Sequence, residues 1–382
     1  MYGIADYWKM MGDHVRRDAY AEALRRTVKP GAVVLNIGTG TGIFAILACR
    51  AGAGRVYAIE DDDIIEVARA LAATNEVQDR IEFIQGLSTD VTLPEQADVI
   101  VSDLRGVLPL HGHHIPSIAD ARRRFLAPGG ALIPQRDAIW AAVVEAPDLY
   151  RLLVAPWGQN PPGLDFEAAR RLAVNRWSKA TVGPDQLLVE PRPWATLEYD
   201  RIESAAVSGD LGWVAARRGI AHGLCVWFVA TLADGVSFSC APDQPERIYG
   251  SGFFPWEDPV ALAAGDFVSA SLQADLVGDD YVWRWASRIH AGGEGGELKA
   301  EFQQSNFYAA PISPTVLRRG SVDLRPHIDE SGEVDRAILG LMNGELTLRA
   351  IADRISLQFP AVFPGRDEAL PRVQHLSRRY SR

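Results

Sequence analysis

The stretch NIGTGTG, residues 36–42, decides the fold of the first part of the chain. It follows the apolar run AVVL and precedes the helical pattern IFAILACRAGA. A strand, a glycine turn and a helix in this order let a ligand approach the backbone and meet the helix N-terminus. The stretch lacks the GK[ST] of a triphosphate-binding loop, and Ile43 stands where a dinucleotide-binding GxGxxG has glycine. Glu60 ends the next apolar run, where it can accept hydrogen bonds from both hydroxyls of a ribose. These features predict an adenosine-type cofactor that carries few negative charges.

Three regions differ in their sequence pattern. Strand-like and helical patterns alternate through residues 1–134, which is typical of a parallel, Rossmann-like α/β sheet. Residues 135–316 carry short alternating runs separated by Gly, Pro and Asp turns, and such runs predict an antiparallel β-barrel or sandwich. An arm at about 157–185 contains a helical pattern, which predicts a helix that packs either against another subunit or over an edge of its own barrel.

Residues 317–382 predict a small helical module of the winged-helix or helix-turn-helix type, with Thr347 as the N-cap of its second helix. SGEVDRAILGLMNGELTLRAIADRISLQFP resembles the modules that bind leader peptides in ribosomal peptide natural-product pathways, such as the pyrroloquinoline quinone peptide carrier. The resemblance implies that a peptide docks there. Simple packing of three helices and DNA binding are the alternatives.

The composition excludes several classes of protein. Of 382 residues, 47% are hydrophobic and 23% are charged, which is typical of a folded globular protein. The formal net charge of -10 disfavours nucleic acid and anionic membranes as partners. The three cysteines have no metal-ligand spacing, and no apolar run approaches the ~20 residues of a membrane span. We therefore expect a cytoplasmic protein without a disulfide framework, a metal site or a membrane segment.

The glycine stretch is part of a longer resemblance. NIGTGTGIFAILACRAGAGRVYAIE, STDVTLPEQADVIVSD and FLAPGGALIP resemble, in one order and at similar spacings, the S-adenosylmethionine core of the protein arginine methyltransferases. KMMGDHVRRDAY is similar to that family's cofactor-covering helix, WGQNPPGLDF to the root of its dimerisation arm, and CAPDQPERIYGSGFFPWEDPVALAAGD to its barrel. The resemblance covers residues 7 to about 305. It implies a homodimeric methyltransferase that uses S-adenosylmethionine.

The same resemblance implies which residues bind the cofactor. Gly38, Gly40 and Gly42 form the backbone cradle, and Glu60 binds the ribose. The other implied positions are Arg16 for the methionine carboxylate, Met10 and Met11 for the sulfonium side, and Ser88 and Thr89 for the adenine. Asn36 replaces a family aspartate and Thr89 a family glutamate, so we expect looser recognition of the adenine. Helix capping, turn formation and core packing are the alternative roles of these residues.

The loop SDLRGVLPLHGHHIP, residues 102–116, departs from the family pattern. Family members hold the substrate guanidinium between two glutamates, because this cation stays protonated near neutral pH. Here Asp103 stands at the first glutamate and Gly112 at the second, and RIYG at 247–250 replaces the family's Thr-His-Trp segment. Arg105 would repel a guanidinium and could instead pair with an anionic group of the substrate. We therefore expect a methyl acceptor other than arginine.

The loop also carries His111, His113 and His114. A neutral imidazole, with an unperturbed pKa of about 6.5, is a suitable general base for a hydroxyl, a carboxylic acid or a ring nitrogen. We expect one of the three to accept the substrate proton, with Asp103 orienting it or the substrate. The alternatives are a solvated surface loop, a metal site, which has no carboxylate or thiolate nearby in sequence, and a site without catalytic activity.

Two classes of function follow from these patterns. The first is a methyltransferase that acts on an oxygen or nitrogen, other than that of arginine, in a peptide or natural-product precursor. The second is a catalytically inactive partner protein that binds S-adenosylmethionine or a peptide. A transcription regulator would need sequence-specific duplex binding, which the acidic balance of the chain disfavours.

Overall fold

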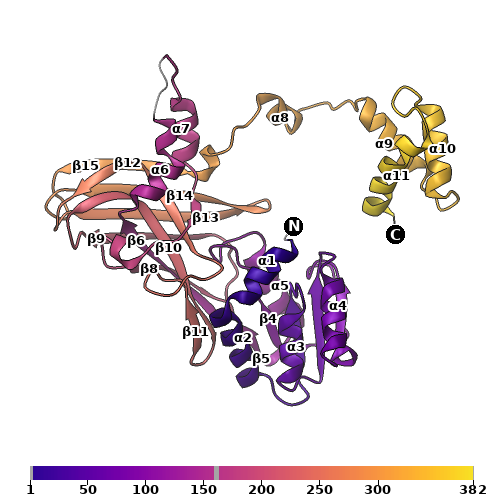
Figure 1. The fold of residues 1–382 in the computed structure, drawn as a ribbon, viewed down its shortest axis with the longest axis horizontal. Helices are drawn as coiled ribbons and strands as arrows, with labels where there is room; N and C mark the ends of the chain where they lie inside the picture. The colour runs from indigo at the N-terminus through magenta and orange to yellow at the C-terminus, as the bar shows by residue number, and fades with distance from the viewer. Residues whose placement is uncertain (1–2, 159–162, 382) are drawn as a thin grey trace. The chain divides into compact units, whose positions relative to one another are not determined.

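The computed structural model describes residues 3–158 and 163–381, which form two compact units with their boundary in the chain between Pro311 and Ile312. The first unit contains a parallel sheet with its helices and two antiparallel sheets, and the second is helical (Figure 1). Residues 159–162, which belong to the predicted arm, lie outside the described part of the chain. Among the described residues, no helix is long and apolar enough to cross a membrane.

The first unit begins with a five-stranded parallel sheet in the order β3-β2-β1-β4-β5. Its strands are β1 (Val33–Ile37), β2 (Arg55–Glu60), β3 (Ile81–Gln85), β4 (Ala97–Ser102) and β5 (Leu126–Ile133). The helices that accompany it are α1 (Ile4–Gly12), α2 (His14–Thr27), α3 (Ile43–Arg50), α4 (Ile65–Thr74), η1 (Gln78–Arg80) and α5 (His114–Phe125). The alternation predicted for residues 1–134 is confirmed. Strand order reverses between β1 and β4, and open α/β sheets bind ligands beyond the carboxyl ends of the strands at such a point.

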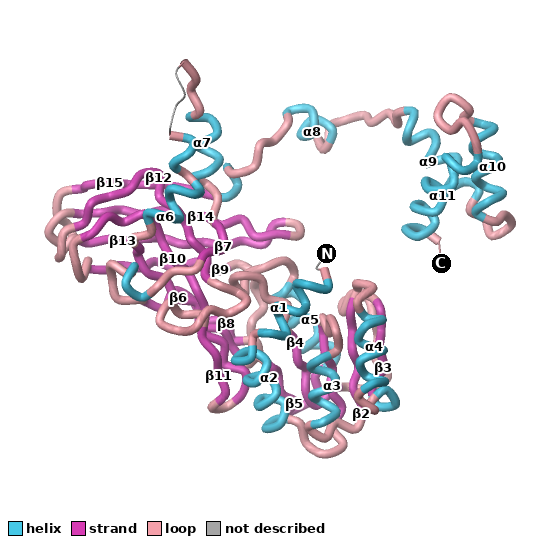
Figure 2. The backbone as a smooth tube through the Cα atoms, in the orientation of Figure 1, coloured by secondary structure: helices cyan, strands magenta, loops and turns pink. Residues whose placement is uncertain are grey.

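The rest of the unit is antiparallel and forms two sheets. Its strands are β6 (Arg136–Val144), β7 (Ser178–Ala180), β8 (Arg192–Glu198), β9 (Val207–Val214), β10 (Gly219–Ala233), β11 (Val236–Ser239), β12 (Ser251–Leu262), β13 (Phe267–Val277), β14 (Asp280–His290) and β15 (Leu298–Ser305), with short turns η3 (Pro184–Gln186) and η4 (Asn306–Tyr308). One sheet has the order β7-β12-β10-β6-β8 with β11 on β10, and the other has the order β15-β14-β13-β9. Figure 2 shows the β10–β11 hairpin reaching α2, where the rings of Tyr20 and Phe238 lie 6.4 Å apart.

The predicted closed barrel is not seen. Among the described strands no hydrogen-bonded ladder joins the two antiparallel sheets. Aromatic side chains instead hold the sheets face to face: Trp194 of β8 lies 5.6 Å from Trp283 of β14, between ring centroids. Burial of these large rings between two layers explains why the alternating runs form a sandwich of sheets.

The arm lies between β6 and β7 and differs from its predicted bounds of 157–185. It consists of α6 (Pro147–Leu153), η2 (Ala155–Trp157) and α7 (Glu167–Val174), and β7 already belongs to the sheet. Tyr150 and Val174 are buried at its base. Leu152 is 73% exposed and Leu164 is 58% exposed, so the outer part of the arm presents apolar side chains to solvent.

The second unit contains α8 (Pro314–Arg319), α9 (Glu330–Leu341), α10 (Leu348–Gln358) and α11 (Arg366–Tyr380). The hydroxyl of Thr347 accepts the backbone N–H of Ala350 at 3.2 Å, which confirms the predicted N-cap. Val334, Ile338 and other apolar residues of α9, α10 and α11 form a separate core. The predicted wing is absent from the described residues 312–381, which form no strand. Residues 359–365 separate α10 from α11 and contain two prolines, which cannot donate to a strand ladder.

Candidate functional site

Two adjoining cavities lie at the carboxyl ends of β1, β2 and β4. The larger has a volume of about 820 Å³ and the smaller of about 230 Å³. Gly38, Glu60 and His111 border both. The walls of the larger cavity also include α1, the loop after β4 and residues 248–249. Its size is within the range of small-ligand sites, about 300–1,000 Å³.

The glycine stretch forms a tight turn that only glycine fits. Gly38, Gly40 and Gly42 have φ angles of 64°, 53° and 80°, in the left-handed region that favours glycine. A Cβ atom at Gly38 would lie 2.3 Å from Leu104, and one at Gly42 would lie 2.9 Å from Ala68. Gly42 is the N-cap of α3, so this helix begins at the wall of the larger cavity.

Asn36 supports the glycine stretch from the end of β1. Its Oδ1 accepts the Thr39 hydroxyl at 2.6 Å, and its Nδ2 donates to the carbonyl of Val101 at 3.2 Å. An aspartate could accept the first bond but could not donate the second. The departure from the family aspartate therefore keeps the turn connected to β4.

Glu60 lies where the sequence places a ribose ligand. One carboxylate oxygen, Oε2, accepts the backbone N–H of Gly40 at 2.7 Å, and Oε1 accepts that of Asp62 at 3.3 Å. Burial raises the pKa of Glu60, although these two backbone donors oppose the rise. A carboxylate oxygen has more than one lone pair, so both oxygens can still accept hydroxyl donors from the cavity.

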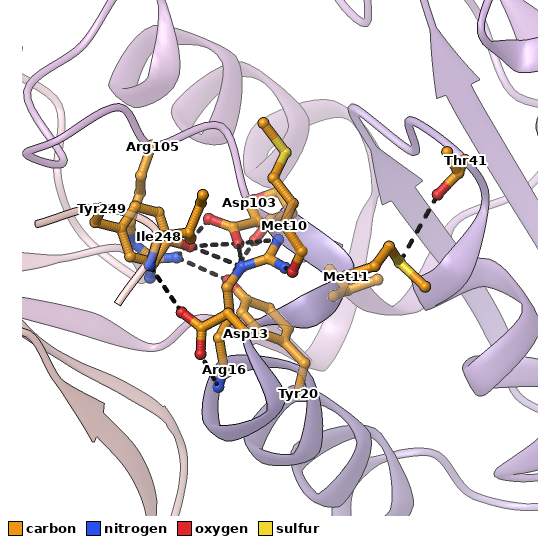
Figure 3. A network of polar contacts seen from close by, with 12 residues as sticks. Met10, Met11, Asp13, Arg16, Tyr20, Thr41, Asp103, Arg105, Ile248 and Tyr249 are labelled. Atoms are coloured by element: carbon orange, nitrogen blue, oxygen red, sulfur yellow. Dashed lines mark hydrogen bonds and ion pairs between the residues drawn. The ribbon is translucent and has the colours of Figure 1, made fainter. Parts of the chain in front are cut away.

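Helix α1 lies over the glycine stretch. Met10 and Met11 border the larger cavity, as the resemblance implies, and the sulfur of Met11 lies 4.0 Å from the Thr41 hydroxyl oxygen (Figure 3). Asp13, between α1 and α2, accepts the backbone N–H of Arg16 at 3.1 Å and that of Ile248 at 2.9 Å. The junction of the two helices is therefore fixed to the residues before β12.

Arg16 of α2 is buried in a network of polar contacts (Figure 3). Its Nε and Nη2 atoms each lie 2.6 Å from Asp103 Oδ2, and Nε also donates to the Tyr249 hydroxyl at 3.0 Å. Nη1 donates to the carbonyl of Met10 at 3.2 Å. Burial would lower the pKa of Arg16, but the negative charge of Asp103 outweighs it and the pKa is raised. Arg16 borders the larger cavity, so Nη1 can present its second hydrogen to a carboxylate there.

Asp103 is engaged by side chains of its own chain. Its Oδ1 accepts Arg105 Nη1 at 3.0 Å, and its Oδ2 accepts the Tyr249 hydroxyl at 2.6 Å in addition to Arg16. Burial would raise the pKa of Asp103, but Arg16 and Arg105 outweigh it and lower the pKa. Asp103 is therefore a buried carboxylate at neutral pH that already holds two guanidinium groups.

The predicted substrate-binding role of Arg105 needs correction. Its side chain has no exposed surface, and its Nε and Nη2 bind Asp137 at 2.7 and 2.9 Å. Nη1 donates to the Tyr20 hydroxyl at 2.7 Å as well as to Asp103. These bonds engage four of the five N–H donors of a side chain without exposed surface, so Arg105 joins α2, the loop after β4 and β6 and does not present its charge to a ligand.

Sequence reasoning missed the acid that makes this arrangement possible. Asp137 is fully buried on β6, and the Tyr199 hydroxyl donates to it at 2.6 Å. The alternation of β6 gives a signal, because Asp137 shares the inward face of the strand with Ile139 and Ala141. A carboxylate on an apolar face requires a buried cation, which Arg105 supplies.

The three histidines of the loop do not form one cluster. His111 is exposed and borders both cavities. His113 is exposed and its Nε2 lies 3.0 Å from Asp279 Oδ1, on the turn between β13 and β14. His114 is buried, its Nε2 lies 2.9 Å from the Tyr199 hydroxyl, and burial together with the nearby Arg105 lowers its pKa to about 3. Among the described residues, no group of three His, Cys, Asp or Glu side chains could hold a metal ion.

Of the two positions implied for adenine, Ser88 borders a cavity and Thr89 does not. Ser88 is buried and borders the smaller cavity, and its carbonyl accepts Arg124 Nη2 at 2.6 Å. Thr89 is exposed, its hydroxyl donates to Asp90 Oδ1 at 3.1 Å, and it is not among the residues that line either cavity. The predicted contact of the Thr89 side chain with adenine is therefore not supported.

Comparison with known proteins gives consistent matches. The family model for ribosomal protein L11 methyltransferase (PrmA) matches residues 11–133. Protein arginine N-methyltransferase 6 of Danio rerio is 32% identical over 239 residues, which are 59% of this chain and 67% of that protein. A probable protein arginine N-methyltransferase 6 of Arabidopsis thaliana is 29% identical over 253 residues. That match covers 64% of this chain and 58% of the Arabidopsis protein, little more than half of its length.

Solved structures share the arrangement of sheets. A chain of the Trypanosoma brucei PRMT1 enzyme-prozyme heterotetrameric complex with AdoHcy superposes with a TM-score of 0.73 at 22% identity. The superposition covers 80% of this chain and 98% of that chain. At this level of identity the likeness establishes a common fold.

Proposed function

Because the chain belongs to the protein arginine N-methyltransferase family, we propose that it is an S-adenosylmethionine-dependent methyltransferase whose acceptor is not arginine. The residues of the two cavities fit that cofactor. A side chain at Gly38 would close the turn against Leu104, and Glu60 keeps lone pairs free for two ribose hydroxyls. Arg16 has a hydrogen left for the methionine carboxylate. When bound, the cofactor supplies a methyl group activated by a sulfonium charge that disappears in the transition state.

The engagement of Asp103 is the observation that carries the proposal about the acceptor. A substrate guanidinium needs two free carboxylates to hold it and to orient one nitrogen. Both oxygens of Asp103 are bound by Arg16, Arg105 and Tyr249, and Gly112 has no side chain to offer. A further guanidinium at this place would also meet two fixed positive charges. We therefore assign a neutral acceptor, an oxygen or nitrogen of a peptide or natural-product precursor.

His111 is the residue best placed to accept the proton of that acceptor. It is the histidine of the loop that borders the larger cavity, whereas His113 faces Asp279 and His114 is enclosed. The imidazole takes the acceptor proton as the acceptor lone pair forms its bond to the methyl group and the carbon–sulfur bond breaks. The structure shows no hydrogen bond between Asp103 and His111, because the contacts of Asp103 go to Arg16, Arg105 and Tyr249.

The test compares His111→Gln with the matched variant His113→Gln. Methyl transfer from radiolabelled S-adenosylmethionine is measured on a library of synthetic peptides that contain Ser and His but no arginine. We expect kcat to fall about 10²- to 10⁴-fold in His111→Gln and to stay within about twofold in His113→Gln. S-adenosylhomocysteine affinity should be unchanged in both. Equal turnover of the two variants would remove the proposed role of His111.

A second candidate function is a non-catalytic partner protein. The superposed Trypanosoma brucei chain comes from an enzyme-prozyme complex, and the occupied Asp103 leaves no carboxylate of the loop free. Such a protein would bind S-adenosylhomocysteine without transferring label to any peptide of the library. Label in any of these peptides would exclude it.

The arm and the C-terminal helices complete the proposal. We place the contact of a cytoplasmic homodimer on the arm, because Leu152, Trp157 and Leu164 expose apolar surface there. The helical unit has its own core and would dock a peptide on its surface, but its described residues form no strand and so offer no sheet edge for strand addition. Binding of a leader peptide to the full chain, and its loss on deletion of residues 312–382, tests that assignment.

A further inference from the structure

His114 is a buried residue for which the proposed reaction has no use. It begins α5, is 1% exposed and borders the smaller cavity together with Glu60 and Ser88. Its Nδ1 has no hydrogen-bond partner among the described residues. His114 thus borders a cavity with one ring nitrogen bound and the other, a buried atom, unpaired, which indicates a place where a ligand completes the hydrogen bonding.

The hydrogen-bond chain beyond His114 fixes which nitrogen carries the proton. The Tyr199 hydroxyl donates its one hydrogen to Asp137 Oδ2 at 2.6 Å, and both oxygens of Asp137 also accept N–H groups of Arg105. Tyr199 must therefore accept from His114, so Nε2 carries the hydrogen of the 2.9 Å bond. In a neutral ring Nδ1 is then a bare acceptor, and burial keeps the ring neutral by lowering its pKa to about 3.

No group of the described residues donates a hydrogen bond to this acceptor. This inference rests on the cofactor proposed above. Its ribose hydroxyls would bind Glu60, which borders both cavities, and its methionine part would lie in the larger cavity with Arg16. The part beyond the ribose is the adenine ring, whose exocyclic amine is its one N–H donor, because the ring nitrogens are acceptors. We propose that His114 Nδ1 accepts a hydrogen bond from the exocyclic amine of adenine and thereby selects an adenosyl cofactor.

This assignment accounts for the position of Thr89. Its side chain faces Asp90 and lines neither cavity, so it does not read the amine in place of the family glutamate. His114, the first residue of α5, supplies the acceptor that Thr89 does not provide. Its tautomer is held by Tyr199 and Asp137, which belong to the antiparallel part of the unit, so cofactor recognition depends on both parts of the fold.

The test measures binding and needs no acceptor substrate. Isothermal titration of the full chain with S-adenosylhomocysteine and with S-inosylhomocysteine compares an amine with a carbonyl at the same ring position. A carbonyl would face the bare Nδ1 lone pair, so wild-type protein should bind the adenosyl compound about 10- to 100-fold more tightly. Equal affinity for the two compounds would overturn the inference. Failure to bind either would instead refute the proposed cofactor.

Variants separate the role of Nδ1 from the packing of the ring. His114→Gln keeps a donor near Nε2 and removes the acceptor, so the preference should fall below about threefold with a normal circular dichroism spectrum. His114→Asn keeps an acceptor near Nδ1 and should retain most of the preference. Tyr199→Phe frees the tautomer without touching the cavity and should also reduce the preference. A preference that survives in both His114→Gln and Tyr199→Phe would contradict the assignment.

Discussion

Replacement of Asp103 by asparagine tests the buried network at its centre. The side chain of Asp103 is 4% exposed and lies between Arg16, which is 10% exposed, and Arg105, which has no exposed surface. Asparagine has nearly the same shape but no charge, and its amide nitrogen would face groups that are all donors. The change leaves two guanidinium groups buried with only Asp137 to neutralise them.

The magnitude follows from the burial of these charges. Removing one partner of a buried ion pair typically destabilises a protein by about 3–5 kcal/mol, because an uncompensated charge remains. We expect Asp103→Asn to lower the free energy of unfolding by that amount at pH 7. The matched control is Glu203→Gln, since Glu203 also binds two arginines, Arg122 and Arg123, but is 62% exposed. Exposed pairs contribute about 0–1 kcal/mol, so the control should differ little from wild type.

Urea unfolding followed by tryptophan fluorescence measures the free energy of unfolding of the first unit, which contains Asp103. All ten tryptophans lie between residues 8 and 285, so the signal does not report on the C-terminal helices. The lowered pKa of Asp103 adds a pH signature. Its contribution is present above the unfolded value of about 3.9 and is lost as the pH falls through the lower folded value. A loss of less than about 1 kcal/mol in Asp103→Asn, equal to that in Glu203→Gln, would refute the buried network.

Three other perturbations have defined outcomes. Glu60→Gln should weaken S-adenosylhomocysteine binding about 10- to 100-fold in a calorimetric titration, because the ribose hydroxyls lose a charged acceptor. The exposed control Glu66→Gln should leave the affinity unchanged. Equal affinities of the two variants would contradict this role of Glu60. Because the folded-state pKa of His114 is lowered to about 3, its contribution to stability is complete above about pH 6.5 and is lost as the pH falls toward 3. Wild-type stability should therefore fall between pH 6.5 and 5.5 by about 1 kcal/mol more than that of His114→Gln, and parallel urea curves would exclude this. Leu152→Glu should convert a dimer to a monomer in analytical ultracentrifugation without changing the circular dichroism spectrum, and an unchanged mass would remove the arm from the interface.

Local patterns predicted the glycine turn and the carboxylate that border the two cavities. The φ angles of Gly38, Gly40 and Gly42 follow from a turn between a strand and a helix, and Glu60 follows from the end of the next strand. Such features depend on neighbours in sequence, and their order along the chain determines their place in a parallel sheet. Thr347 as a helix cap belongs to the same class of signal.

The burial of each histidine in the loop could not be predicted, because it depends on the residue at which α5 begins. His113 is the N-cap, and His114 is the first residue of the helix, so two adjacent side chains point to solvent and to the core. The role of Arg105 depended on Asp137, a residue of another sheet whose contact with the loop no local pattern encodes. A closed barrel also could not be distinguished from two separate sheets, because the alternation along a strand indicates its inward face but not which strand its edge pairs with.

The identity of the methylated atom tests the central claim most directly. Peptides that take up label from S-adenosylmethionine, offered with and without arginine, are digested and the modified residue is located by tandem mass spectrometry. The buried pairing of Asp103 with Arg16 and Arg105 predicts a methyl group on an oxygen or nitrogen outside any guanidinium. A methyl group on an arginine guanidinium nitrogen would show that the site still holds such a substrate and would contradict the account.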